Sequence, residues 1–306
     1  MTTDAATLPA RVAIGHKGGF VYRFAPIAAV VVFLLVCWYA LAVWLNAPLV
    51  IDQHTRDDTS WTARDLVVGT WSMERPVLPA PHQIAENLRE TVFNTPIDSK
   101  RSLVYHAGVT VSATLLGFVF GSLLGILLAV GIVHLAALDR SLLPWIIASQ
   151  AVPILAIAPM VVVLGNLGLD GLLPKAIISM YLCFFPVTIG MVKGLRSPDP
   201  LQLDLMRTYS ASQAQTFRKL RWPAATAFLF TSLKVAIATS LVGAIVGELP
   251  TGAQAGLGAR LLSGSYYGQT VQIWSALVMA SLLGLGLVFL VGMAERLVLR
   301  SQGAPP

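Results

Sequence analysis

Residues 199–225, DPLQLDLMRTYSASQAQTFRKLRWPAA, form the one long polar interval in the C-terminal two thirds of a very apolar chain. The interval separates two segments that are each apolar enough to cross a bilayer, and it carries Arg207, Arg218, Lys219 and Arg221. Neighbouring helices are usually joined by about two to eight residues, so a connection of this length is not needed for linking alone. We infer that this loop contacts another protein.

The pattern of the loop predicts two short amphipathic helices. Apolar residues recur among polar ones over 201–206 and resume at Phe217 and Leu220, with a small-residue turn at 209–212 between them. Pro223 is expected to end the second helix, and Phe217 is expected to be an exposed anchor for the partner. The alternative is a solvated basic loop that follows the positive-inside rule.

The composition is that of a polytopic membrane protein. Of 306 residues, 56% are hydrophobic and 12% charged, whereas soluble domains carry about 25% charged residues. The net charge of +6 implies no nucleic-acid partner, because membrane proteins gather Lys and Arg on their cytoplasmic side. Cys37 and Cys183 both fall in apolar segments, where packing is a better explanation than a disulfide or a metal site.

The hydropathy pattern predicts an all-α fold with six transmembrane helices. About 20 apolar residues cross the hydrocarbon core, and residues 25–45 already form such a run. The sequence Ala40-Leu41-Ala42 also resembles a signal-peptidase site, but the apolar run is long for a signal peptide, so we favour an uncleaved helix. The predicted parts are a cytoplasmic tail (1–24), the first transmembrane helix (25–46), a periplasmic segment (47–104), a five-helix core (105–300) containing the loop 199–222, and a tail (301–306).

The core spans are expected at 106–134, 142–164, 173–192, 225–246 and 271–290, the second of these interrupted by Pro153 and Pro159. Within the periplasmic segment, Ile84, Leu88 and Val92 follow Leu-Pro-Ala-Pro (78–81) at helical spacing. They predict an amphipathic helix near 81–93, lying at the membrane surface. Residues 47–77 are expected to be irregular.

The Lys and Arg distribution predicts that both termini and the 199–223 loop are cytoplasmic, since cytoplasmic loops carry the excess of these residues. The residues placed inside by this topology are Arg11, Lys17, Arg23, Arg140, Lys193, Arg196, Arg207, Arg218, Lys219, Arg221, Arg296 and Arg300.

Gly117, Gly121 and Gly125 recur every four residues on one face of the second span. Small residues at this spacing let helix backbones approach closely, so we expect this face to pack on another helix; helix flexibility is the alternative.

The chain has no signature of catalysis. It lacks the glycine-rich phosphate loop of an ATPase and any His, Cys or carboxylate set with metal-ligand spacing. Gln150, Lys234 and Glu248 are polar residues in or at the ends of spans and are candidates for a translocation path. Lys234 could instead reach toward the cytoplasmic surface, and Glu248 could be a helix-end carboxylate. Fourteen residues, about 21 Å of straight helix, separate these two, so they cannot pair.

Residues 204–212, DLMRTYSAS, followed by Gln215, Phe217, Arg218 and WPAA (222–225), resemble the cytoplasmic EAA loop of ABC importer permeases, E-A-A-R-T-L-G-A-S. In that family the loop docks in a groove of the ATPase subunit. Asp204 stands for Glu, Leu205-Met206 for Ala-Ala, and Ser210 for Gly, which turns more easily. The resemblance implies that the coupling residues are Asp204, Arg207, Thr208, Ser210, Ala211, Ser212, Gln215, Phe217, Arg218 and Pro223.

The resemblance extends over about 78–300. Residues 153–159, 185–186, 194–200, 233–236, Glu248 and 256–258 match family motifs in order, and Leu-Pro-Ala-Pro is similar to the sulfonate and nitrate branch. It implies the type I permease subunit of an importer in the bacterial inner membrane, with cytoplasmic ABC ATPases, a periplasmic or lipid-anchored substrate-binding protein and a second copy, giving a homodimer in the lipid bilayer. No cofactor is expected in this chain, because ATP and Mg would bind the ATPase.

The expected solute is a sulfonate such as taurine, nitrate or a pyrimidine-like compound, with the last favoured. A stand-alone secondary transporter or channel is the alternative; it would show inverted repeats, a broken helix or paired intramembrane ionisable groups. A membrane anchor for a cytoplasmic complex is a third possibility.

Overall fold

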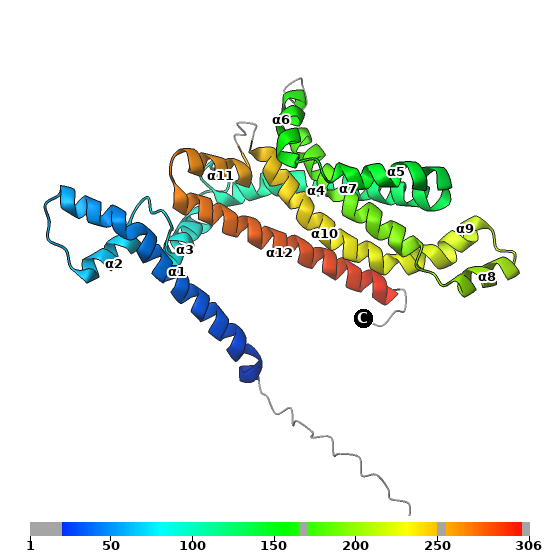
Figure 1. Ribbon diagram of the computed structural model, residues 1–306, viewed down its shortest axis with the longest axis horizontal. Coiled ribbons are helices and arrows are strands. Elements are labelled where there is room, and N and C mark those ends of the chain that lie inside the picture. Colours follow the sequence, from blue (N-terminus) through cyan, green and yellow to red (C-terminus); the bar gives the residue numbers. More distant parts are fainter. Residues whose placement is uncertain (1–19, 166–170, 250–254, 302–306) are drawn as a thin grey trace, which may run out of the picture. The chain divides into compact units, whose positions relative to one another are not determined.

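The computed structural model of the chain describes residues 20–165, 171–249 and 255–301, and every regular element in these ranges is a helix (Figure 1). Most of the predicted N-terminal tail (1–19) and most of the C-terminal tail (302–306) lie outside the described residues. The chain divides into two units, Met1–Met73 and Glu74–Pro306.

The first unit is a hairpin of α1 (Phe20–Arg56) and α2 (Ala63–Ser72). A Cβ on Gly69 of α2 would lie 3.1 Å from Val50 of α1, and the rings of Tyr39 and Trp71 meet edge to face at 5.3 Å. The expectation that 47–77 is irregular is therefore wrong, because α1 continues to Arg56 and α2 follows it.

A capping box explains where α2 begins. The Asp65 amide donates to Thr62 Oγ1 at 3.3 Å, and the Thr62 amide donates to Asp65 Oδ2 at 3.0 Å. These bonds satisfy two amides that the first turn leaves without helical partners. The side-chain and backbone hydrogen bonds from Thr62 hold the pKa of Asp65 below its usual range.

The second unit contains the remaining helices. In chain order these are α3 (Pro81–Arg89), the π-helical turn η1 (Glu90–Asn94), α4 (Leu103–His134), α5 (Ala136–Ser149), α6 (Ile154–Gly165), α7 (Leu172–Leu195), α8 (Pro200–Thr208), α9 (Gln213–Thr216), the π-helical turn η2 (Phe217–Arg221), α10 (Trp222–Glu248), α11 (Leu257–Tyr266) and α12 (Thr270–Ser301).

Five helical runs in the described residues are long and apolar enough to cross a membrane, and a bent pair of helices adds a sixth if it counts as one span. The six agree with the number of spans predicted from the sequence. The continuous runs are Ala25–Arg56, Leu103–His134, Leu172–Leu195, Gln213–Glu248 and Thr270–Arg300.

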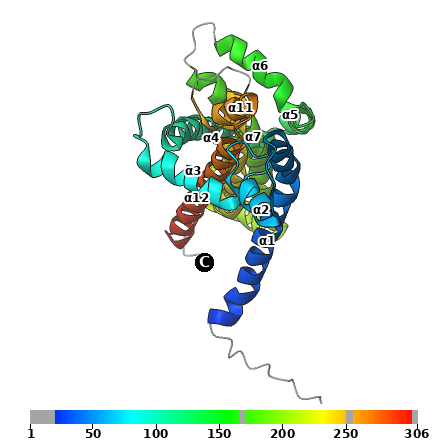
Figure 2. The ribbon, with the colours of Figure 1, turned by 90° about the vertical axis from the view of Figure 1, so that its left-hand side faces the viewer.

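The bent pair is α5 and α6, whose axes turn by 91° across a short break, so that α6 leaves the direction of α5 in both views (Figures 1 and 2). This bent pair contains three prolines, Pro144 inside α5, Pro153 and Pro159. Pro153 lies in the break and ends the regular helix, because proline has no N–H to donate and crowds the preceding turn. Pro159 lies inside α6 without ending it.

Pro223 does not end a helix, contrary to the prediction. The helical run continues from Gln213 to Glu248 with Pro223 in the first turn of α10. Just before it, η2 has a wider helical turn, in which the Trp222 amide donates to the Phe217 carbonyl. Such a π-helical turn rearranges the hydrogen bonds where proline would interrupt an α-helix.

Helix α7 lies between α4 and α10 and packs along both. On the α4 side, a Cβ on Gly117 would lie 2.4 Å from Ser179 Cβ, and one on Gly121 would lie 2.7 Å from Cys183 Cβ. A Cβ on Gly125 would lie 2.8 Å from the carbonyl oxygen of Phe184. The glycine face of α4 therefore contacts α7 backbone to backbone, as membrane helices do where small residues align.

Replacing Gly121 by Leu should reduce the amount of folded protein. Even the new Cβ would lie 2.7 Å from Cys183 Cβ of α7, which is closer than van der Waals contact allows. Overpacking of a close contact costs about 1–3 kcal/mol. The monodisperse fraction after detergent extraction measures the loss. Gly108→Leu is the matched control on the same helix, since a Cβ there meets nothing within 4 Å. Equal losses in both variants would contradict the contact.

The apolar face of α3 packs on protein rather than on the membrane surface. Ile84 is buried, and Leu88 packs with Val92 of η1 against a cluster of Leu103, Leu257, Ala276 and Ala280 from α4, α11 and α12. The Thr270 hydroxyl also donates to the Pro76 carbonyl just before α3. The amphipathic pattern of α3 therefore comes from its contact with α12. An apolar helix face can be buried against protein or against lipid, and the pattern alone does not distinguish the two.

Candidate functional site

The polar loop that follows α7 is a helical hairpin at one end of the second unit, and α11 lies at the opposite end (Figure 1). Its first helix, α8, begins at a complete capping box. The Leu201 amide donates to Asp199 Oδ1 at 2.8 Å, and the Asp199 amide donates to Gln202 Oε1 at 3.2 Å. Pro200 occupies the first helical position, where no amide hydrogen is needed. The hairpin therefore starts at a fixed point.

The turn between α8 and the second helix is also built by local hydrogen bonds. Ser210 has φ +52, the left-handed conformation that glycine adopts at less cost. Beyond it, Ser212 and Gln215 cap the second helix reciprocally: the Gln215 amide donates to Ser212 Oγ at 3.2 Å, and the Ser212 amide donates to Gln215 Oε1 at 2.8 Å. Ser212 and Gln215, both expected to be coupling residues, thus shape the turn.

An exposed apolar stripe runs along α8. Leu201, Leu205 and Tyr209 follow one another at four-residue spacing and are 78%, 55% and 76% exposed. Residues at this spacing share one helix face. On the same helix Asp204 and Arg207 form an exposed ion pair of 3.1 Å, and the Thr208 hydroxyl donates to the Asp204 carbonyl at 3.0 Å. The predicted site omitted the three stripe residues, although their spacing in the sequence shows them.

Phe217 is not the exposed anchor that the sequence suggested. Its ring meets His134, the last residue of α4, at 5.3 Å, and Trp222 at 5.8 Å. The Arg221 guanidinium donates to the Leu195 carbonyl at the end of α7, at 3.3 Å. An aromatic side chain gains more from burial than from exposure, so Phe217 joins the second helix of the hairpin to the helix bundle.

A hollow of about 270 Å³ lies between the hairpin and the end of α4. Ala211 lines it together with the basic side chains Arg207 and Arg221, while Arg218 and Pro223 lie outside it and are exposed. Eight of the ten predicted coupling residues are thus divided among the exposed α8 face, the turn, the hollow and the contact with the bundle, and Arg218 and Pro223 belong to none of these groups.

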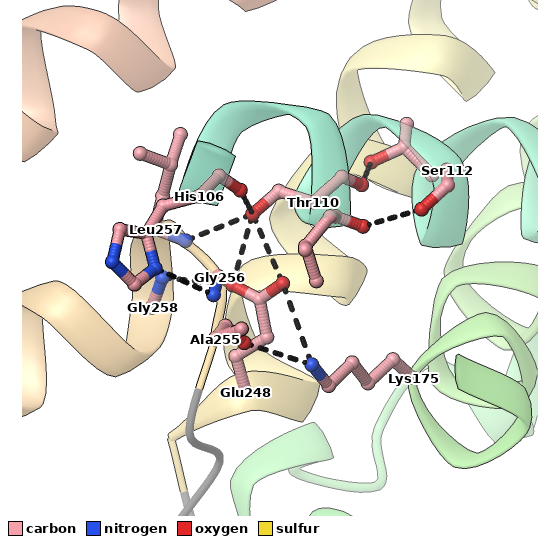
Figure 3. A network of polar contacts seen from close by, with 11 residues as sticks. His106, Thr110, Ser112, Lys175, Glu248, Ala255, Gly256, Leu257 and Gly258 are labelled. Carbon is pink, nitrogen blue, oxygen red and sulfur yellow. Dashed lines mark hydrogen bonds and ion pairs between the residues drawn. The ribbon is translucent and has the colours of Figure 1, made fainter. Parts of the chain in front are cut away.

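At the other end of the second unit, Glu248 is 0% exposed and lies in a network of polar contacts (Figure 3). The amide of Gly258 donates to Glu248 Oε2 at 2.8 Å, and Thr110 Oγ1 lies 2.9 Å from Oε1. Lys175 Nζ lies 3.9 Å from Oε1 and donates to the Ala255 carbonyl at 3.0 Å. A carboxylate buried in this way needs several donors, and α4, α7 and the start of α11 supply them.

The same network fixes the backbone that enters α11. The amide of Gly256 donates to His106 Nδ1 at 2.9 Å, so the proton of the neutral ring is on Nε2, 2.9 Å from the Lys100 carbonyl. Gly256 has φ +124, and a Cβ there would lie 2.2 Å from Glu248 Cδ. Only glycine fits at this position, for both reasons.

A second polar junction lies deeper among the three central helices. The Ser240 hydroxyl of α10 donates to the Thr114 carbonyl of α4 at 3.0 Å, and Ser179 of α7 lies 2.6 Å from the same hydroxyl. All three residues are 0% exposed. Small hydroxyl residues satisfy one another inside the bundle, where lipid would offer no partner.

The three residues predicted for a translocation path do not come together. Lys234 of α10 forms an ion pair with Glu295 of α12, and Gln150 is exposed at the bend after α5, where its side-chain amide donates to Ser149 Oγ at 3.4 Å. Glu248 lies in the buried network. Lys175, Thr110 and His106 were missed, because their partners are distant in the sequence.

Two further points concern chemistry. Among the described residues, no group of three or more His, Cys, Asp or Glu side chains could hold a metal ion. In α11, outside the spans, burial lowers the pKa of the Arg260 guanidinium. The Gln272 side chain donates to the Arg260 carbonyl and to Ser263 Oγ, both at 3.1 Å, so that α11 is fixed to α12.

Comparisons with known proteins agree with these features. The model of the family described as binding-protein-dependent transport system inner membrane component matches residues 121–302. A probable ABC transporter permease protein of Haemophilus influenzae is 30% identical over 73% of this chain and 91% of its own length. The riboflavin transport system permease protein of Chloroflexus aurantiacus is 30% identical over 74% and 81%. The formylaminopyrimidine transport permease protein of Halalkalibacterium halodurans is 32% identical over 60% and 68%.

Proposed function

The chain belongs to the family of binding-protein-dependent transport system inner membrane components, the permease subunits of ABC importers, and we propose that it works as a homodimer on two ATPase subunits. It is a transport subunit rather than an enzyme. In this proposal ATP and Mg bind the ATPases, a periplasmic or lipid-anchored protein delivers the solute, and both termini face the cytoplasm. Closure of the ATPase pair pulls the two hairpins and moves the helix bundles between inward and outward access.

The observation that carries this proposal is the exposed stripe Leu201, Leu205 and Tyr209 on a helix with a fixed beginning and end. An exposed apolar face with polar neighbours marks a protein contact. The hairpin is also joined to the bundle through Phe217 and Arg221, so a force on the stripe reaches α4 and α7. A solvated connector would need neither feature.

Reconstituted uptake tests the function directly. Vesicles containing the permease, its ATPase and its binding protein should accumulate solute only with ATP, and the ATPase variant that cannot hydrolyse ATP should abolish uptake. Uptake without the ATPase would favour a stand-alone transporter. The structure has two features that such a transporter would share, the bend between α5 and α6 and the ion pair of Lys234 with Glu295; Pro153 accounts for the bend locally, and uptake with and without the ATPase decides between the two functions.

For the solute we propose a pyrimidine-like compound. The relatives named above include permeases for riboflavin and formylaminopyrimidine, and both compounds contain a pyrimidine ring. Other relatives are named for aliphatic sulfonates and nitrate. Binding of labelled pyrimidines, a sulfonate and nitrate to the cognate binding protein separates these classes. Tight binding of a sulfonate or nitrate alone would overturn the proposal.

Cysteine labelling tests the proposed topology. In a variant lacking Cys37 and Cys183, single cysteines at Ser60 and Ser212 should react with a membrane-impermeant reagent from opposite sides. Both positions are exposed, so reactivity reports the side and not burial. Labelling of both cysteines from the same side would contradict the six-span topology.

A further inference from the structure

A groove of about 490 Å³ runs along the face of α7 that lies between α5 and α10. Its apolar walls are Leu143 and Ile147 of α5, Ile189 and Val192 of α7, and Phe228 of α10. Ile147 is 55% exposed, so the groove opens sideways from the helix bundle. An apolar groove that opens sideways from transmembrane helices opens to the hydrocarbon core of the bilayer. Lipid acyl chains make up this core, so an acyl chain is the molecule that meets the groove.

One end of the groove is basic. Lys193 and Arg196 of α7 line it, and Arg196 is already paired with Asp139 of α5 at 2.9 Å. Lys193 Nζ lies 6.0 Å from the centre of the Phe228 ring, and in the described parts of the chain it has no carboxylate partner. The charged side chains of the groove therefore sum to one positive charge at a single end.

The depths of the two ends fit a phospholipid. Lys193 lies in the last turn of α7, next to the hairpin, which is the level of lipid headgroups. Ile147 lies eleven residues beyond the start of α5, about 16 Å along that helix at 1.5 Å per residue. Along α5 the apolar wall runs from Leu143 to Ile147, about 6 Å at 1.5 Å per residue. A cation at headgroup level beside such a wall matches a phosphate and the adjoining part of an acyl chain.

We propose that this groove binds one anionic phospholipid, with the phosphate at Lys193 and an acyl chain along Ile189, Ile147 and Phe228. Basic pockets between transmembrane helices bind anionic headgroups in this way. The lipid would lie between α5 and α7, which in the described ranges are joined by the Arg196–Asp139 pair and by the bond from Tyr181 to the Ser149 carbonyl.

Native mass spectrometry of the full-length chain tests the proposal. The detergent-solubilised protein is mixed with phosphatidylglycerol or phosphatidylcholine of the same acyl chains, and retained lipid is counted. Wild type should retain phosphatidylglycerol preferentially. Lys193→Gln should lower this retention about fivefold, the effect of one cation near an anionic headgroup. Ile147→Trp should lower retention of both lipids by filling the groove without changing its charge.

Lys219→Gln is the matched control, because Lys219 is an exposed cation of the hairpin outside the groove, and it should retain phosphatidylglycerol like wild type. Equal retention of both lipids by wild type would overturn the proposal. So would full competition by inorganic phosphate, which would make the site a free-anion site. Loss of the dimer in Ile147→Trp with unchanged lipid retention would show that a second copy covers the groove, and would overturn it too.

Discussion

Replacing Tyr209 by Ala should leave the chain folded and inserted but weaken its association with the ATPase about 30-fold. Tyr209 is 76% exposed at the end of the α8 stripe, so shortening its side chain removes little buried area from the fold. Exposed aromatic residues that become buried at an interface often contribute about 2 kcal/mol, and each 1.4 kcal/mol is tenfold in affinity. Binding of the purified ATPase to permease in nanodiscs measures the change.

Tyr267→Ala is the matched control, since Tyr267 is 69% exposed and directly follows α11, and α11 lies far from the hairpin (Figure 1). It should bind the ATPase like wild type. Phe217→Ala should behave differently from Tyr209→Ala, because it removes a contact with His134 and loosens the hairpin itself. Undiminished binding by Tyr209→Ala would exclude the stripe as the docking face.

Much of the fold could be predicted from local patterns. Apolar runs of about 20 residues give the spans, and the glycine face of α4 gives a close helix contact. The helix that packs on that face, α7, could not be predicted. Small residues indicate that another helix comes close, but they do not identify which helix it is. Pro144 and Pro159 lie inside α5 and α6, and only Pro153 lies at a break, so the prolines alone did not identify where the span bends.

The candidate site, too, could be predicted only as far as local sequence patterns define it. The hairpin was found because its polarity contrasts with the spans, and its caps, Ser212 and Gln215, are local signals. The burial of Phe217 depends on His134, which lies 83 residues earlier, and the pairing of Lys234 depends on Glu295 on another helix. Contacts of this kind are set by packing, so the sequence showed a lone intramembrane lysine where the structure has an ion pair.

The largest effect on stability is expected at Glu248. Glu248→Ala removes the acceptor of the Gly258 amide and the Thr110 hydroxyl and leaves the Lys175 charge without its carboxylate. Breaking a buried charge pair from one side costs about 3–5 kcal/mol. Glu248→Gln keeps one oxygen for the Gly258 amide and should cost less, about 1–3 kcal/mol. The alanine variant should therefore lose most of its folded protein.

Cys183 reports this loss, because it is 0% exposed and reacts with a thiol dye only when the bundle opens. In a Cys37→Ser background, the midpoint of thermal unfolding should fall in the order wild type, Glu248→Gln, Glu248→Ala. Lys175→Met leaves the Glu248 carboxylate without its cation and should be costly alone. Combined with Glu248→Gln it should cost less than the sum of the two single changes, because neither charge is then left unpaired. If the losses of stability in the two single variants simply add in the double variant, the charges of Lys175 and Glu248, 3.9 Å apart, do not stabilise each other. The hydrogen bonds alone would then hold α11 to α4 and α10.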